Sequence, residues 1–142
     1  MERKIVIAIV IYFSCIGLLF SQETKIESND FIMEYKNHEI RADTKYYGKK
    51  VVISGLCDEF NIFVDPRIGE FRNQGYSYVP SVTMYLERGN FFKGAVIFHF
   101  SNEQKELIAG FDIGSKMIIE GTVYKCNGPY IYIVDCKVIQ DI

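Results

Sequence analysis

The sequence predicts a mainly β domain: a five-stranded barrel with an N-terminal helix and a short helix between its third and fourth strands. Three observations predict it. Strand-like segments fill most of the chain after residue 49. Two of them carry a glycine in mid-strand, where a barrel strand has to bend. The chain also has 11 Phe, 10 Tyr and no Trp, a composition that suits packed strands.

The N-terminus precedes this domain. A charged start at residues 1–4 is followed by the apolar run 5–20 and then by the small Ser21. This order is typical of a secretory signal peptide that is cleaved after Ser21, so we expect residues 1–21 to be removed and the protein to be periplasmic or extracellular. The apolar run is at the short limit for a spanning helix, about 17–25 residues. An uncleaved anchor is therefore the alternative, and lipidation at Cys15 is a less favoured one.

A polar leader at 22–28 leads into a single domain at 29–142. Apolar residues then recur on one face of a helix predicted at 29–46. Ser28 or Asn29 can cap its start, and Gly48 is a natural end. The predicted buried face consists of Phe31, Ile32, Tyr35, Ala42 and Tyr46.

The first three strands follow the helix. Apolar alternation predicts a strand at 50–57 with its bend at Gly55. Residues 58–75 keep no sustained period and are predicted to be a long loop, which has room for a short strand of its own. The second strand is predicted at 76–86, with its ladder starting at Ser81, because Pro80 has no N–H to donate. Residues 87–90 form a hairpin turn, and the third strand covers 91–100.

The remaining elements complete the barrel. Ser101 and Gln104 have the spacing of a capping box and open a short helix that ends at Gly110. The fourth strand is predicted at 116–124 with Gly121 in its middle, and the last strand at 130–139 after a tight Asn–Gly turn. This order of strands and helices is that of the OB-fold, a five-stranded Greek-key barrel.

The OB order also predicts a register. The first and fourth strands pair in such a barrel, and both bend at a glycine. We therefore expect one set of side chains from the two strands to share the core: Val51, Ile53, Met117, Ile119 and Val123.

Two segments carry a family resemblance. The first spans 37–55, with Asn37, an Ala-Asp pair, a tyrosine, Gly-Lys and the strand VVISG. The second runs from 98 to 138 and includes the pair Asp135-Cys136 in the last strand. Together they resemble the tRNA_anti-like family, small exported OB-fold domains named for their similarity to the anticodon-binding domains of tRNA synthetases. The resemblance implies a fold and no catalytic residues. The chain departs from the family at 58–80, which is longer and more aromatic.

Three cysteines remain after processing, which allows one disulfide and one free thiol. Cys57 ends the first strand and Cys136 lies late in the fifth, which runs the same way. We expect these two to be neighbours that can form a disulfide, with Cys126 free. None of the three has a metal-ligand spacing, so we predict neither a metal site nor a cofactor.

The sequence does not predict an enzyme. It has no Gly-rich phosphate loop and no G-x-S-x-G motif, and its neighbouring carboxylates suit solvated turns and helix faces. His99 stands between Phe98 and Phe100 and is expected on the outward face of its strand.

We therefore predict an exported, non-catalytic binding module whose partner is a protein or an envelope component. The aromatic-rich segment 60–80 is the expected contact. The alternative is binding of single-stranded nucleic acid or of an oligosaccharide on the second and third strands, although the net charge of −2 disfavours nucleic acid. The candidate ligand-binding residues on those strands are Tyr76, Tyr78, Tyr85, Arg88, Phe91 and Lys93.

Overall fold

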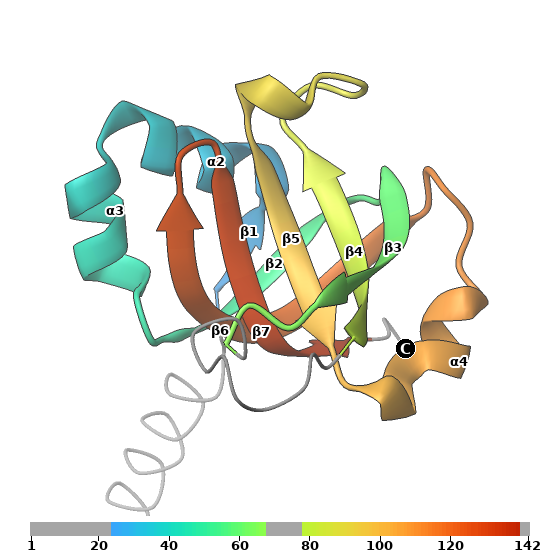
Figure 1. The fold of residues 1–142 in the computed structure, drawn as a ribbon. Coiled ribbons are helices and arrows are strands. Elements are labelled where there is room, and N and C mark those ends of the chain that lie inside the picture. The colour runs from blue at the N-terminus through green and yellow to red at the C-terminus, as the bar shows by residue number, and fades with distance from the viewer. Residues whose placement is uncertain (1–23, 68–77, 140–142) are drawn as a thin grey trace, which may run out of the picture.

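The computed structural model describes residues 24–67 and 78–139, and the predicted signal peptide (1–21) lies outside them, together with the first two residues of the predicted polar leader. Seven strands and three α-helices are described (Figure 1). The strands are β1 (Lys25–Glu27), β2 (Lys50–Leu56), β3 (Glu59–Val64), β4 (Tyr78–Tyr85), β5 (Ala95–Phe100), β6 (Lys116–Asn127) and β7 (Tyr130–Val138). The helices are α2 (Ser28–Asn37), α3 (Glu39–Tyr46) and α4 (Lys105–Ala109).

All seven strands belong to one sheet in the order β1-β2-β6-β7-β5-β4-β3. The pairs β1–β2 and β5–β7 are parallel, and the other pairs are antiparallel. β2 and β3 are consecutive in the chain yet lie far apart in this order. The two residues between them make a corner. The Cys57 N–H donates to the Ser115 carbonyl at 2.9 Å, and the Asp58 N–H donates to the Thr83 carbonyl at 2.9 Å.

The mainly β prediction is confirmed, and the order of elements is OB-fold-like. The predicted five strands and closed barrel are wrong. Within residues 24–67 and 78–139, the hydrogen-bonded sheet has seven strands and does not close on itself. The predicted first strand (50–57) is β2, which ends at the corner formed by Cys57 and Asp58. The predicted loop that follows begins with a further strand, β3. Residues 25–27 add β1 beside β2.

The predicted register of the first and fourth strands is confirmed. β2 pairs antiparallel with β6, and Ile53 lies opposite Ile119. Val51, Ile53, Met117, Ile119 and Val123 all belong to one buried core cluster, as expected. Alternation along a strand places the intervening residues on the other face of the sheet.

Gly121 lies in β6 opposite Val51, where the sheet is tightly packed. A Cβ atom there would lie 2.6 Å from Cγ2 of Ile133, 2.8 Å from Sγ of Cys136 and 3.1 Å from a backbone carbonyl. We expect Gly121→Ala to lower the free energy of unfolding by about 1–3 kcal/mol, measured by urea denaturation, because these neighbours must move. Gly110→Ala is the control, since its nearest atom is 3.4 Å away. Equal losses for the two variants would contradict the packing described.

The predicted helix at 29–46 is two helices. The chain breaks at His38, whose φ of −160° and ψ of 86° are not helical. The His38 Nδ1 accepts the Arg41 N–H at 3.1 Å and so caps α3. The predicted apolar face is nevertheless confirmed. Phe31, Ile32, Tyr35, Ala42 and Tyr46 are all buried.

The loop predicted at 58–75 contains β3, and β4 starts before the proline. Ile62 of β3 lies opposite Pro80 of β4. β5 pairs with β4 only from Ser81 onward, so Pro80 has a paired strand on one side. A proline is tolerated there because a strand with one neighbour needs fewer N–H donors.

Two short segments that flank β5 differ from their predictions. Residues 91–93, predicted as the start of a strand, form a 3₁₀ turn before β5. The predicted capping box at Ser101 makes no side-chain hydrogen bond. Instead residues 102–104 form a 3₁₀ turn in which the Gln104 N–H donates to the Ser101 carbonyl at 3.0 Å.

Cys57, Cys126 and Cys136 are all free thiols, so the expected Cys57–Cys136 disulfide is not formed in this structure. Cys57 and Cys136 are buried. Burial raises the pKa of the Cys57 thiol to about 12. Within the described part of the chain, no helix has the length and apolar character that crossing a membrane requires.

Candidate binding groove

A groove of about 500 Å³ lies on the face of the sheet opposite the core, over β5, β7 and the end of β6. Its lining is mostly apolar and aromatic, with a few polar groups at the floor and rim. We call it the aromatic groove, and its lining residues are Phe63, Val64, Asp65, Pro66, Phe91, Ile97, His99, Lys125, Asn127 and Tyr132.

Aromatic rings build two sides of this groove. The Phe91 ring lies 4.3 Å from that of Tyr130 and meets Tyr85 edge-on at 5.9 Å. On the floor, Tyr132 stacks on His99 with centroids 5.9 Å apart. Phe91 is 42% exposed and its neighbour Phe92 is 86% exposed. Rings held by other rings and still open to solvent are suited to contact a ligand.

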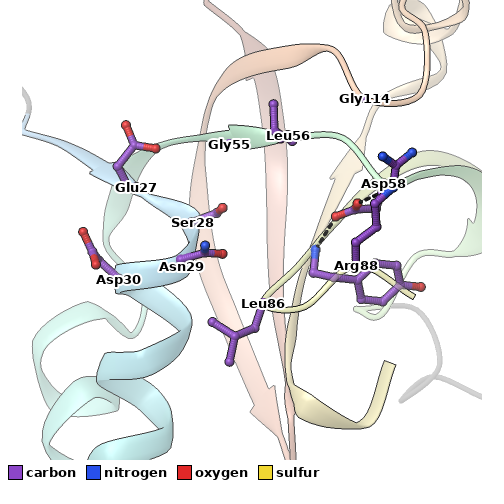
Figure 2. Close-up of a pocket in the computed structure, with 11 residues that line it drawn as sticks. Glu27, Ser28, Asn29, Asp30, Gly55, Leu56, Asp58, Leu86, Arg88 and Gly114 are labelled. Atoms are coloured by element: carbon purple, nitrogen blue, oxygen red, sulfur yellow. Dashed lines mark hydrogen bonds and ion pairs between the residues drawn. The ribbon is translucent and has the colours of Figure 1, made fainter. Parts of the chain in front are cut away.

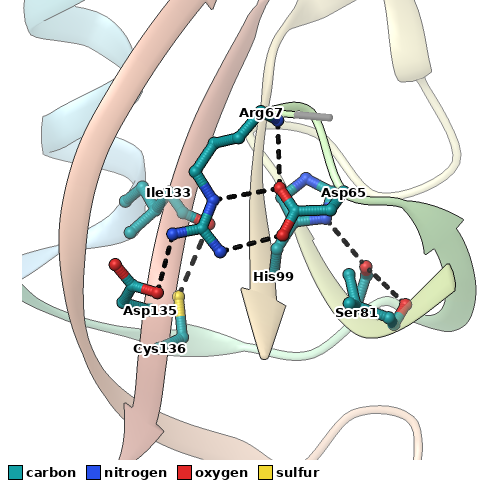
Figure 3. Close-up of polar contacts among 8 residues, drawn as sticks. Asp65, Arg67, Ser81, His99, Ile133, Asp135 and Cys136 are labelled. Atoms are coloured by element: carbon teal, nitrogen blue, oxygen red, sulfur yellow. Dashed lines mark hydrogen bonds and ion pairs between the residues drawn. The ribbon is translucent and has the colours of Figure 1, made fainter. Parts of the chain in front are cut away.

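The chain segment after β3 forms one boundary of the groove and is held there by Arg67 (Figure 3). The Arg67 guanidinium donates two hydrogen bonds to the Asp65 carboxylate, at 3.1 Å to Oδ1 and 2.8 Å to Oδ2. It donates a third, at 2.8 Å, to Oδ1 of Asp135 in β7. The Asp65 carboxylate is buried. The hydrogen bonds that Arg67 donates lower the pKa of the Asp65 carboxyl group. Asp135 has a φ of +54°, a conformation that non-glycine residues seldom adopt.

His99 lies under this segment. It is 4% exposed, and within the described part of the chain its Nε2 has no hydrogen-bond partner. Burial, which disfavours the charged imidazolium, lowers the pKa of His99 to about 4. His99 points away from the Phe98 and Phe100 core as expected, but the outward face on which it lies is covered.

Ser81, His99 and Asp65 are close together but do not form a catalytic triad. The Ser81 Oγ contacts Nδ1 of His99 at 3.1 Å and also lies 3.4 Å from the Val79 carbonyl. Ser81 is 1% exposed, so its hydroxyl is not accessible to a substrate. The Asp65 carboxylate is engaged by Arg67. These contacts hold the floor of the groove in place.

The structure separates the residues that the sequence predicted as ligand contacts. Phe91 lines the aromatic groove, whereas Tyr85 and Arg88 line a second cavity of about 470 Å³ beside the start of α2 (Figure 2). There the Tyr85 N–H donates to Asp58 Oδ2 at 2.7 Å, and Arg88 Nε lies 3.7 Å from Asp58 Oδ1. Tyr78 is exposed at the start of β4. Tyr76 lies outside the described residues.

The charges around the groove are largely paired. Lys93, another predicted contact, forms an ion pair with Glu87. Arg67 is bound by two aspartates. Among the described residues that line the groove, Lys125 is exposed and makes no recorded ion pair. The described surface here is therefore aromatic with little excess positive charge.

The sequence predicted neither Lys125 nor Tyr132 as a contact, and it did not predict the bonds of Arg67 to Asp65 and Asp135 beside the groove. Phe63 belongs to the segment 60–80, which was expected to contact a partner. The available signal was Asp65 two residues before Arg67, because an aspartate side chain accepts a hydrogen bond from the backbone N–H two residues on, as Asp65 Oδ1 does from the Arg67 N–H at 3.0 Å. Asp135 lies sixty-eight residues further along the chain from Arg67, and no local pattern connects them.

Comparison with solved structures gives a likeness of fold. A crystal structure described as a "putative nucleic acid-binding lipoprotein" from Klebsiella pneumoniae is 19% identical, with a TM-score of 0.63, and the match covers 83% of this chain and 92% of that chain. At this identity the likeness shows the fold alone. A chain from the structure of yeast Stn1 and Ten1 is 10% identical with a TM-score of 0.39, covering 86% and 65%, which is too distant for any argument.

Sequence comparison adds no family. No protein-family model matches the chain, and no curated protein matches it. Of what the tRNA_anti-like resemblance implies, only the OB-fold-like arrangement of elements is therefore supported.

Proposed function

We propose that this chain is an exported, non-catalytic binding module whose aromatic groove holds apolar side chains of a partner protein. The observation that supports this most is Phe91, which lines a preformed groove and whose ring packs against those of Tyr130 and Phe92. Partner proteins use exposed aromatic residues of this kind as anchors, because rigid rings bury a large area at low entropic cost.

The electrostatics favour a neutral partner over a polyanion. Arg67, Arg88 and Lys93 are each paired with carboxylates, and the whole chain has a net charge of −2. Proteins that bind single strands combine stacking rings with a positively charged path for the phosphates. Export is supported by the order of charges and apolar residues at 1–21.

Single-stranded nucleic acid is the second candidate. The exposed rings of Phe91 and Phe92 favour it, as does Lys125, which forms no ion pair within the described residues. The fold likeness to the Klebsiella protein favours it too. Base stacking is worth about 1–3 kcal/mol per ring, so a few rings can bind a strand weakly without many cations.

A photo-crosslinking residue at Phe92, introduced in the native host, tests the main proposal. We expect the crosslinker at Phe92 to form a covalent adduct with a partner protein. The control is the same crosslinker at Tyr47, which is 60% exposed at the end of α3 and should not form this adduct. With the identified partner purified, Phe91→Ala should weaken binding by at least about tenfold, or 1.4 kcal/mol.

The second candidate is tested by titrating the purified chain into a fluorescein-labelled oligothymidylate. We expect a dissociation constant of about 10⁻⁴ M or weaker, the range of non-specific binding. Two results together would favour nucleic acid over a protein partner. The first is micromolar affinity for the oligonucleotide that Phe91→Ala abolishes, and the second is equal protein adducts from the crosslinkers at Phe92 and Tyr47.

A further inference from the structure

β3 is the last strand in the sheet order, and in the described part of the chain it pairs only with β4. Ile62 is 55% exposed and Phe63 is 38% exposed. Edge strands carry unpaired N–H and C=O groups, and proteins usually protect them with prolines, lysines or bulges. The β3 sequence EFNIFV has none of these, and its single charge is at its first residue, Glu59.

A second apolar groove lies between α4 and the sheet, over β3 and the adjoining Pro80 and Ser81 of β4, and Figure 1 shows β3 and α4 on the same side of the molecule. It has a volume of about 490 Å³, and Phe60, Ile62, Ile108 and Phe111 contribute to its lining. Ile108 is buried in the core and anchors α4 there. A strand edge beside an apolar groove and a short helix is the arrangement that accepts an added peptide strand.

Lys105 supplies a charge at the rim of this groove. It is exposed, and no ion pair is recorded for it in the described part of the chain. The carboxylate of Glu59 is engaged by the Asn61 side chain at 3.1 Å. Among the described residues that line this groove, Lys105 is therefore a positive group that forms no ion pair and that complements a carboxylate of a ligand.

We propose that an extended peptide segment of a partner protein adds to the outer edge of β3 as a further strand. Its backbone pairs with the free edge, and alternate apolar side chains enter the groove against Ile62 and Phe111. An acidic residue or a terminal carboxylate of the segment pairs with Lys105. A backbone edge selects an extended backbone as its complement, whereas a folded surface or a small molecule would leave the N–H and C=O groups unpaired. The groove against α4 shares no lining residue with the aromatic groove, although β3 contributes to both, so the inference does not depend on the proposed function.

A phage library of random dodecapeptides, panned against the full chain, provides the probe. We expect enriched sequences with alternating apolar residues and an acidic residue. Synthetic copies should bind the chain and should lose at least about tenfold in affinity to Lys105→Glu. The charge-matched control is Lys137→Glu on β7, an exposed residue outside the groove, which should bind as the wild type does.

Backbone methylation of the peptide distinguishes strand addition from simple apolar binding. Methylating one amide nitrogen at a time leaves the protein unaltered, and affinity should fall at every second position, because only alternate N–H groups face β3. Hydrogen exchange of the amides in 60–64 should slow in the complex. Failure to enrich any peptide, an unaltered affinity for Lys105→Glu, or methylation effects without a two-residue period would each overturn the proposal.

Discussion

Ile53→Ala is expected to lower the free energy of unfolding by about 2–5 kcal/mol. Ile53 is fully buried in the core cluster and lies opposite Ile119 in the β2–β6 ladder. Alanine would remove three carbons from a site enclosed by both strands, so the loss combines the transfer of those groups to water with the cavity they leave. Urea denaturation measures the change.

The same strand offers a control for this substitution. Leu56 is 58% exposed at the end of β2, so Leu56→Ala should alter the free energy of unfolding by less than about 0.5 kcal/mol. Similar losses at 53 and 56 would show that the inward face of β2 has been assigned incorrectly.

Stability is expected to fall by about 3 kcal/mol as the pH is lowered from about 6.5 to about 4, through His99 alone. The unfolded chain takes up a proton on this imidazole near pH 6.5, whereas burial prevents the folded chain from doing so until about pH 4. Between these values the unfolded state binds more protons, so acid favours unfolding. Above pH 6.5 His99 contributes no pH dependence.

Urea denaturation at a series of pH values measures this effect. His99→Asn should flatten the curve between about pH 6.5 and 4, whatever stability it costs at neutral pH. The control is His38→Asn, which retains a side-chain cap for α3 and removes the other histidine of the chain. A slope that is lost in the His38 variant and kept in the His99 variant would contradict the assignment.

The sequence predicted the parts of the fold that local chemistry determines. Alternation in 50–56 and 116–124 correctly placed Ile53 and Ile119 inside, and the Asn127–Gly128 turn was located correctly because a left-handed Gly128 is required there. β3 was not predicted as a definite strand, because the alternation of polar and apolar residues in EFNI stops at Phe63 and is too short to be decisive. The helix break at His38 carries neither proline nor glycine.

The candidate groove was predictable only in part. Phe91 was identified as the first residue of the predicted third strand, but Tyr132 and Lys125 come from strands that are distant in sequence. Arg88 and Lys93 looked like ligand contacts because they are basic residues beside aromatic ones. Their ion pairs with Asp58 and Glu87 depend on how the turn folds back, which spacing does not show.

The place of β7 in the sheet has a consequence for synthesis of the protein. β7 is the last described strand along the chain, and it lies at the centre of the order, between β6 and β5. In the described part of the chain, hydrogen bonds join the half-sheet β1-β2-β6 to the half-sheet β5-β4-β3 only through it. A nascent chain that lacks residues 130–138 therefore holds two half-sheets with no strand between them. The two half-sheets can therefore be joined by strand pairing only after residues 130–138 have left the ribosome.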